Sequence, residues 1–195
     1  MLTKPKLSTP MLVLIGGLIV VAVLVLISAS PVLPSTRAVD LEQVKEIAKQ
    51  YIAKGGNDFR IEEIMEFSNN FYIMIQEENT GINAFELLVD RYTARISIEP
   101  GPNMMWNQKY GHMGRIDNPT ASMPIDSQEA SQYAQGWLDK YFSDASVEEV
   151  NVFYGYYTMD LSKDGRIFGM LSVNGFSGEV WYHSWHGEFI RMEEY

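Results

Sequence analysis

The 195-residue sequence contains no cysteine and only three histidines. The absence of cysteine excludes disulfide bonds, thiol catalysis and thiolate metal sites. A Walker loop, a dinucleotide-binding glycine motif, an HExxH zinc motif and a nucleophile-elbow serine are also absent from the sequence. We therefore expect this protein not to be an enzyme.

Acidic residues are absent from the first 38 positions, and all 25 of them follow. The formal net charge of the chain is −10. An acidic surface repels phosphate backbones, which predicts that the protein has no nucleic-acid partner. Such a surface favours cationic partners or metal ions, or simply keeps the protein solvated. The 46% share of hydrophobic residues predicts a packed core rather than disorder.

Residues 11–30 form an apolar stretch without charged side chains. As a helix, a stretch of this length crosses a bilayer core of about 30 Å. We expect an uncleaved signal-anchor, and a cleaved signal peptide is the alternative. Because Lys4 and Lys6 precede it, residues 1–10 are expected in the cytoplasm and the acidic part outside it, in a single-pass membrane protein. Two prolines make residues 31–39 a stiff tether.

The remaining sequence shows one pattern twice, an amphipathic helix followed by short strands. Residues 40–101 form the first module, residues 127–195 form the second, and residues 102–126 connect them. In the first helix, Asp40 and Gln43 occupy the positions of an N-terminal capping box. The copies align at an offset of 84 to 86 residues. The predicted fold class is α+β, in which each helix covers one face of an antiparallel sheet.

The expected helices begin at Asp40 and at Ser127 and end at the Gly55-Gly56 pair and at Phe142. The expected strands span residues 60–65, 71–76, 84–89 and 95–98 in the first module, and residues 147–153, 156–160, 167–173 and 179–183 in the second.

A similar turn follows the third strand of each copy. It reads Val89-Asp90-Arg-Tyr-Thr93-Ala94 in the first copy and Val173-Asn174-Gly-Phe-Ser177-Gly178 in the second. With the helix and strands, this turn resembles the PepSY family, whose turn has the form Val-Asp-x-x-Thr-Gly. Ala94 replaces the glycine in one copy, and Asn174 replaces the aspartate in the other. The resemblance implies a non-catalytic role, either in binding or inhibiting peptidases or in regulating events near the cell surface.

The connector contains soft metal ligands, which are Met104, Met105, His112 and Met113. Thioether and imidazole groups without cysteine suit copper in the Cu(I) state. The alternative is that these methionines fill an irregular gap between the two modules, because methionine adapts to uneven packing. The sequence leaves both possibilities open.

The C-terminal segment is unusually rich in aromatic and imidazole side chains, which are Trp181, His183, Trp185 and His186. In an extended strand the two histidines would point to opposite faces, and only a turn near Ser184 would bring them together. Exposed on a surface, these residues would form a platform for a peptide or glycan. Otherwise they belong to an aromatic core strand with hydrogen-bonded histidines.

Three functions follow from this sequence. The first is a membrane-anchored extracytoplasmic binding or regulatory module that holds a polypeptide on a sheet face or edge. The second is copper or other soft-metal handling through the connector. The third is an accessory subunit of a membrane complex, with the apolar helix packed against other helices.

Overall fold

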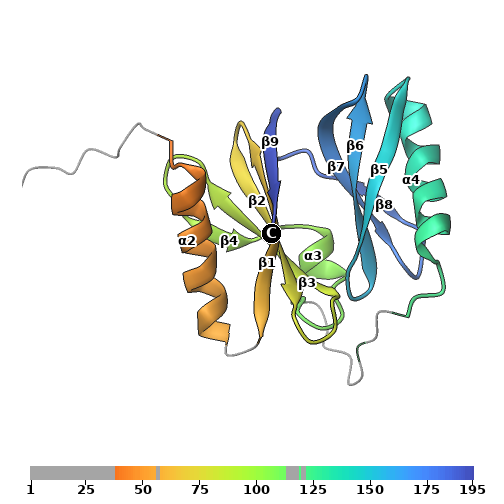
Figure 1. Cartoon of the computed structure of the whole chain (residues 1–195). Coiled ribbons are helices and arrows are strands. Elements are labelled where there is room, and N and C mark those ends of the chain that lie inside the picture. The colour runs from red at the N-terminus through yellow and green to blue at the C-terminus, as the bar shows by residue number, and fades with distance from the viewer. Residues whose placement is uncertain (1–37, 56–57, 113–118, 120–121) are drawn as a thin grey trace, which may run out of the picture. The chain divides into compact units, whose positions relative to one another are not determined.

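Two antiparallel sheets and two long helices make up most of the described part of the protein (Figure 1). The structure is a computed structural model that describes residues 38–55, 58–112, 119 and 122–195. The expected cytoplasmic end, the apolar span and most of the tether therefore lie outside the described residues. Among the helices within the described ranges, none has the length and apolar character to cross a membrane.

Helix α2 (Leu41–Ile52) opens the first module, and its predicted capping box is confirmed. The Asp40 carboxylate accepts a hydrogen bond from the Gln43 backbone N–H at 2.9 Å, and the Gln43 side chain accepts one from the Asp40 N–H at 3.0 Å. These two bonds satisfy donors that a helix start leaves unpaired. The 3₁₀ turn η1 (Ala53–Gly55) follows the helix.

The first sheet contains five strands in the order β4-β3-β2-β1-β9. Its strands are β1 (Phe59–Phe67), β2 (Asn70–Glu77), β3 (Asn83–Asp90), β4 (Ile96–Ile98) and β9 (Phe189–Glu194). The sequence did not predict β9, which pairs antiparallel with β1. The C-terminal strand thus completes the sheet of the first module.

The second module begins with helix α4 (Ser127–Tyr141), as predicted. Its sheet has the order β5-β6-β7-β8, with β5 (Ala145–Val152), β6 (Tyr156–Lys163), β7 (Arg166–Asn174) and β8 (Val180–Tyr182). The connector contains a short helix, α3 (Pro102–Met105), that the sequence did not predict. The α+β class with two antiparallel sheets is confirmed.

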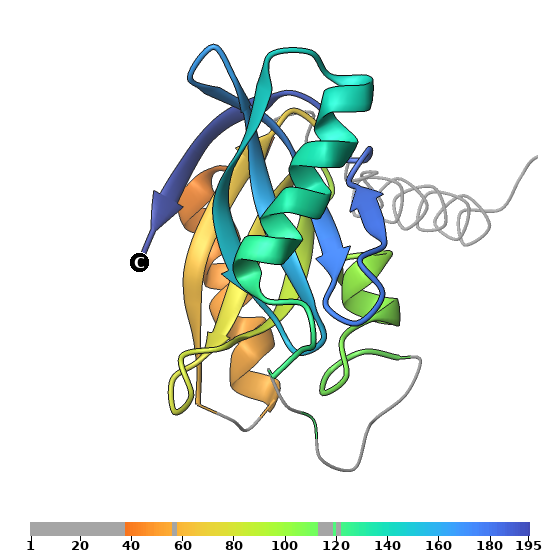
Figure 2. The same cartoon turned by 90° about the vertical axis from the view of Figure 1, so that its right-hand side faces the viewer.

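These elements form four layers, because each helix covers the outer face of its own sheet and the inner faces pack together (Figures 1 and 2). Side chains from both sheets fill the space between the inner faces. We call them the inter-sheet layer: Met65, Phe67, Tyr72, Met74, Phe153, Tyr156 and Met170. Each large apolar side chain buried there stabilises the packing by about 1.5–3 kcal/mol.

Strand pairing defines which residues of the two copies are equivalent. Tyr72 pairs with Leu88 in the first sheet, and Thr158 pairs with Ser172 in the second. Leu88 and Ser172 are 84 residues apart, whereas Tyr72 and Thr158 are 86 apart. The hairpin that joins β6 and β7 is shorter than the one between β2 and β3, which explains why the offset between the copies falls from 86 to 84 residues. Both values lie within the offset of 84 to 86 residues that the sequence predicts, and Tyr72 is equivalent to Thr158.

Candidate metal centre

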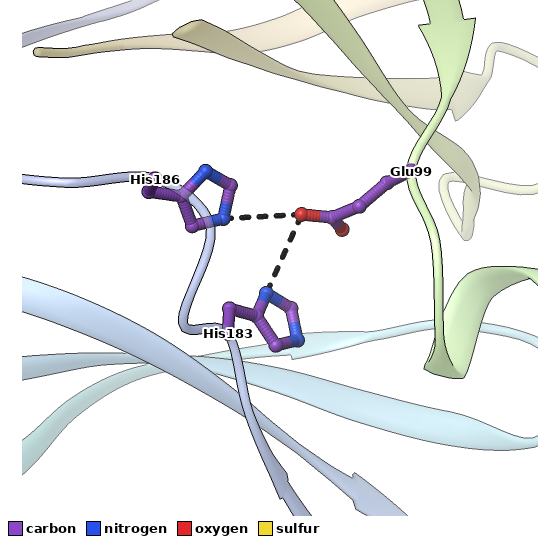
Figure 3. A group of neighbouring side chains, drawn as sticks. All are labelled: Glu99, His183 and His186. Carbon is purple, nitrogen blue, oxygen red and sulfur yellow. Dashed lines mark ion pairs between the residues drawn. The ribbon is translucent and has the colours of Figure 1, made fainter. Parts of the chain in front are cut away.

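Three buried side chains meet between the two sheets (Figure 3). Glu99 directly follows β4, His183 directly follows β8, and His186 lies three residues further on. Their exposed fractions are 0%, 2% and 1%. Glu99 and His183 occupy equivalent positions of the two copies, 84 residues apart. The backbone N–H of each donates to the third strand of its own sheet, to Glu86 and Met170 respectively, at 3.0 Å.

A turn at Ser184 and Trp185 brings the two histidines together. Beyond β8 the chain therefore does not continue as an extended strand, in which the imidazoles would diverge. The Trp185 ring stacks on His183 with centroids 4.9 Å apart, and its indole N–H donates to Glu99 Oε1 at 3.0 Å. Trp185 thus positions both the carboxylate and one of the imidazoles.

One oxygen of Glu99 faces both imidazoles. Oε1 lies 3.4 Å from His183 Nδ1 and 3.1 Å from His186 Nε2. Neither ring nitrogen makes a hydrogen bond of acceptable geometry, and Glu99 Oε2 also has no hydrogen-bond partner among the described residues. Ligand atoms around a tetrahedral zinc ion stand about 3.3 Å apart, given metal–ligand bonds of about 2.0–2.1 Å. The observed spacing matches that of metal ligands.

The hydrogen bonds of Asn70 determine the tautomer of His186. The Asn70 amide nitrogen donates to the Trp185 carbonyl at 3.2 Å, which leaves its oxygen as the acceptor for His186 Nδ1 at 2.9 Å. In a neutral imidazole only one nitrogen carries a proton, here Nδ1. The lone pair of His186 Nε2 therefore points toward Glu99.

A chain of hydroxyl groups leads from Glu86 to His183. Thr158 contacts Glu86 at 2.8 Å, Ser172 lies 2.9 Å from Thr158, and His183 Nε2 lies 3.0 Å from Ser172. When Ser172 accepts from His183 Nε2, a neutral His183 presents its Nδ1 lone pair to Glu99.

Burial and charge act in opposite directions on these groups. Burial disfavours ionisation of Glu99, but the charge of His183 and the contacts from both histidines override it and hold the pKa of Glu99 well below its usual range. Burial lowers the pKa of His186, which favours the neutral imidazole. Burial, reinforced by the charge of Glu99, raises the pKa of Glu86 well above the carboxylate range. The centre thus combines an ionised carboxylate with a neutral imidazole at His186.

This ligand set suits a divalent ion of the first transition row. Imidazole nitrogen with carboxylate oxygen is a donor combination that zinc and its neighbours accept. Asn70 and Ser172 would hold the outer nitrogens of the two rings and so fix their orientation, as hydrogen-bond partners of metal-bound histidines do. Glu99 Oε2 is an additional oxygen without a hydrogen-bond partner at the same place.

The connector residues predicted to bind copper lie elsewhere. Met104 is half-buried, Met105 and His112 are exposed, and Met113 lies outside the described residues. The His112 N–H donates to the Met104 carbonyl at 2.9 Å, so these two backbones are adjacent. Within the described ranges, His112 belongs to neither group of histidine and acidic side chains at ligand spacing. The soft-metal site in the connector remains a prediction.

The C-terminal residues predicted to bind a partner have different environments. His183 and His186 are buried, whereas Trp181 and Trp185 are partly buried. Trp181 meets Trp106 of the connector edge to face, with ring centroids 6.0 Å apart. The histidines therefore belong to the buried cluster with Glu99, and a binding platform formed by the two tryptophans remains a prediction.

Sequence reasoning did not find Glu99 or its supporting residues. Glu86 carried a usable signal, because it is a carboxylate within the otherwise apolar run 84–89. Glu99 had no such signal, since it stands at the end of a short strand where an exposed acid is common. Its burial depends on the second sheet, which lies far away in the sequence.

Comparison with known proteins adds a weak likeness. Neither a family model nor a curated protein matches the chain. Among solved structures, the chain is similar to the Bacillus megaterium YpeB C-terminal domain, with 13% sequence identity and a TM-score of 0.30. The similarity covers 77% of this chain and spans 64% of the length of that one.

Proposed function

We propose that this chain is a non-catalytic binding protein whose ligand is a divalent transition-metal ion, in the first place Zn²⁺, held by Glu99, His183 and His186. One observation carries the proposal. Two imidazole nitrogens, His186 Nε2 and His183 Nδ1, face the same carboxylate oxygen at 3.1 and 3.4 Å without a hydrogen bond of acceptable geometry. When both imidazoles are neutral, their lone pairs and the carboxylate repel one another in this buried site, and a cation between them removes that repulsion.

The ion would connect the two modules. Glu99 comes from the first sheet, and His183 comes from the second. The three ligands are at most 2% exposed, so the ion would be enclosed by protein rather than open to a substrate. We therefore assign it a structural or regulatory role, in which the metal supply controls how firmly the two modules are joined.

The sequence supports a cellular setting for such a module. The apolar stretch at residues 11–30 and the basic residues before it support a single membrane anchor with the metal-binding part outside the cytoplasm. The resemblance to PepSY modules supports a regulatory or peptidase-modulating role. In this proposal the metal-bound state is the one that engages the partner.

The experiment is a zinc titration of the full chain in mild detergent after removal of metals with a chelator. We expect one Zn²⁺ per chain by calorimetry and a higher unfolding temperature. A free Zn²⁺ concentration of 100 times Kd stabilises the folded protein by about 2.7 kcal/mol. His186→Gln and Glu99→Gln should weaken binding at least tenfold. The control is His112→Gln, which removes the third, exposed histidine and should leave zinc binding unchanged.

Three results would contradict the proposal: no zinc binding tighter than about 10 μM, zinc binding that persists unchanged in both ligand variants, or loss of binding in His112→Gln. The same preparation titrated with Cu(I) tests the connector. Copper binding that depends on Met104 and Met105 but not on His186 would make soft-metal handling the function.

A groove beside α4 favours polypeptide binding as a second candidate function. The groove is open and runs between α4 and the chain around β8. It is lined by Gln132, Tyr133, Gly136, Trp137, Lys140, Gly178 and Val180. Aromatic walls with one lysine suit an extended peptide that carries apolar and acidic side chains. A library of such peptides should yield binders that compete with one another and that Trp137→Ala no longer binds.

A further inference from the structure

A second group of ligand atoms lies between the two sheets, and it consists of carboxylates alone. Oxygens of Glu63 on β1, Glu149 on β5 and Glu194 on β9 all lie within 4.8 Å of one another. Glu63 and Glu149 are 86 residues apart and occupy equivalent positions of the two copies. Each stands at an irregularity in its strand, where the pairing register shifts. Such bulges redirect side chains and are common next to functional sites.

Asp160 is a further buried acid close to this group: its charge acts on Glu63, although its oxygens are not among those at ligand spacing. On β6 it shares a face with Tyr156 and Thr158, which both reach across to Glu86 of the first sheet. Asp160 is 2% exposed, and its Oδ1 atom has no hydrogen-bond partner among the described residues. A buried carboxylate oxygen without a donor is costly, and the cost disappears when a cation binds it.

The charges around Glu63 and Asp160 are all of one sign. Burial, followed by the carboxylates of Asp160, Glu149, Glu194 and Glu62, raises the pKa of Glu63 to about 8. Burial, followed by Glu149 and Glu148, raises the pKa of Asp160 to about 7.

The neighbouring polar groups of the cluster are already engaged with other partners. Arg60 forms an ion pair with Glu62 at 2.6 Å. Glu148 accepts hydrogen bonds from Ser146 and Ser162. Within the described residues, the cluster has carboxylates and no positive group of its own.

We propose that Glu63, Asp160, Glu149 and Glu194 bind a Ca²⁺ ion at this second place between the sheets. Oxygen ligands without nitrogen or sulfur suit hard cations. Oxygens that lie within 4.8 Å of one another can share one Ca²⁺ ion, whose Ca–O bonds are about 2.4 Å long. Ca²⁺ accepts irregular coordination by several carboxylates, whereas Mg²⁺ demands a near-ideal octahedron and usually keeps several waters. The exposed Glu149 and Glu194 leave the ion a path from solvent.

The two metal sites share one design. In each, equivalent positions of the two copies face one another across the interface, Glu99 with His183 and Glu63 with Glu149. The donors differ, and so does the ion that each site selects. Calcium binding at the carboxylates does not depend on the proposed zinc centre, and the two are tested separately.

The test uses the full chain in mild detergent, freed of metals by a chelator and titrated with Ca²⁺ at pH 7.5. We expect one Ca²⁺ per chain by calorimetry and an upward shift of the unfolding temperature that Mg²⁺ at the same concentration produces to a smaller extent. Glu63→Gln and Asp160→Asn should each weaken Ca²⁺ binding at least tenfold. Both variants should remain folded, because the amide keeps the shape of the carboxyl group that it replaces.

Glu193→Gln is the matched control. It removes the same charge from the strand position next to Glu194. The Glu193 side chain points to the opposite face of β9 from the Glu194 side chain. This variant and His186→Gln should both retain the calcium response. The proposal is overturned if millimolar Ca²⁺ leaves the wild-type unfolding temperature unchanged. It is also overturned if the Glu63 and Asp160 variants respond like the wild type, or if Mg²⁺ acts as strongly as Ca²⁺.

Discussion

The two modules have the same strand pairing, but at one paired position they place a buried acid on different strands. In the first sheet Met74 pairs with Glu86, and at the equivalent position of the second sheet Asp160 pairs with Met170. Both acids face the other sheet, yet their environments differ. Glu86 accepts hydrogen bonds from three hydroxyl groups, whereas one oxygen of Asp160 has no donor among the described residues.

The comparison indicates how two copies of one module acquire different buried environments. The backbone scaffold tolerates an acid on either strand, and the neighbouring side chains decide the consequence. Tyr72, Tyr156 and Thr158 make Glu86 part of a satisfied polar network. Asp160 is instead buried near the carboxylates of Glu149 and Glu148, and the burial and these charges raise its pKa. Divergence at interface positions, with the turns and strands preserved, therefore gives two unlike environments.

The largest effect is expected when Glu86 is replaced by its counterpart in the other module. Glu86→Met leaves the hydroxyl groups of Tyr72, Tyr156 and Thr158 without their acceptor between the sheets. Each buried unsatisfied group costs about 1–3 kcal/mol. We expect the free energy of unfolding to fall by about 4 kcal/mol, measured by urea denaturation.

A matched pair of milder changes sharpens the same contrast. Glu86→Gln and Asp160→Asn each convert a buried acid to its amide with almost no change in shape. The first should destabilise by about 1 kcal/mol because it weakens hydrogen bonds, and the second should stabilise in the absence of calcium because it removes repulsion. Changes of equal sign would show that the two environments do not differ as described.

The second effect concerns Glu77, which joins the first module to the connector and the second module. Its carboxylate contacts Lys109 and Tyr110 of the connector and accepts from Tyr154 at 2.7 Å. The equivalent position on β6 is Lys163, a basic residue with a different contact. Glu77→Gln breaks the partly buried ion pair with Lys109 and weakens the other contacts, and we expect a loss of about 2 kcal/mol at pH 7 by chemical denaturation.

The effect of Glu77→Gln should depend on pH. Burial alone would raise the pKa of Glu77. The contacts with Lys109, Tyr110, Tyr154 and Thr80 outweigh burial and lower this pKa from its ordinary value of 4.5 to about 2. Because the folded state holds the ionised form more tightly, this stability is complete above about pH 4.5 and is lost as the pH falls toward 2. The difference between wild type and variant should therefore shrink between pH 5 and pH 2. A difference that is constant over this range would contradict the ion-pair explanation.

The third effect concerns the turn after β7. Gly178 has a φ of +72°, where a side chain is strained. A Cβ atom placed there would stand 3.0 Å from the Tyr133 ring. Gly178→Ala should therefore destabilise by about 1–2 kcal/mol. Gly136→Ala is the control, because that helical glycine has open space around its Cβ position, and it should stabilise by up to about 1 kcal/mol. Equal losses in both variants would contradict the conformational argument.

Much of the fold was predictable because local patterns determine it. The capping box at Asp40, the start of α4 and the turns follow from residues within a few positions of each other. Strand β9 was not predictable, because its partner β1 lies more than a hundred residues away. Its sequence, Phe189–Glu194, alternates weakly and is mostly exposed.

The candidate sites were predictable only in part. The two histidines and the requirement for a turn near Ser184 were evident in the sequence. Glu99 and the carboxylate group were not, because their side chains meet across an interface between two modules. The packing of one sheet on the other determines which acids become buried, and no local sequence pattern predicts this packing.

The smallest effect concerns the same turn in the first module, where Ala94 stands in place of glycine. The two turns have the same hydrogen bonds from the backbone. Asp90 and Asn174 each accept from the backbone two and three residues ahead, and the N–H of Ala94, like that of Gly178, donates to the strand-end carbonyl at 3.0 or 2.9 Å. Ala94 has a φ of +57°, a conformation that costs an alanine about 1 kcal/mol.

Ala94→Gly should therefore stabilise the protein by about 0.5 kcal/mol, because relief of strain exceeds the added entropy of the unfolded chain. The change opposes that of Gly178→Ala, and the double variant should lie near the sum, since the two turns are in separate modules. Urea denaturation of the wild type, the two single variants and the double variant measures the effect of each substitution and tests whether the two effects add. A destabilising Ala94→Gly would mean that the first module tolerates its alanine without strain and that the two turns are alike in hydrogen bonding only.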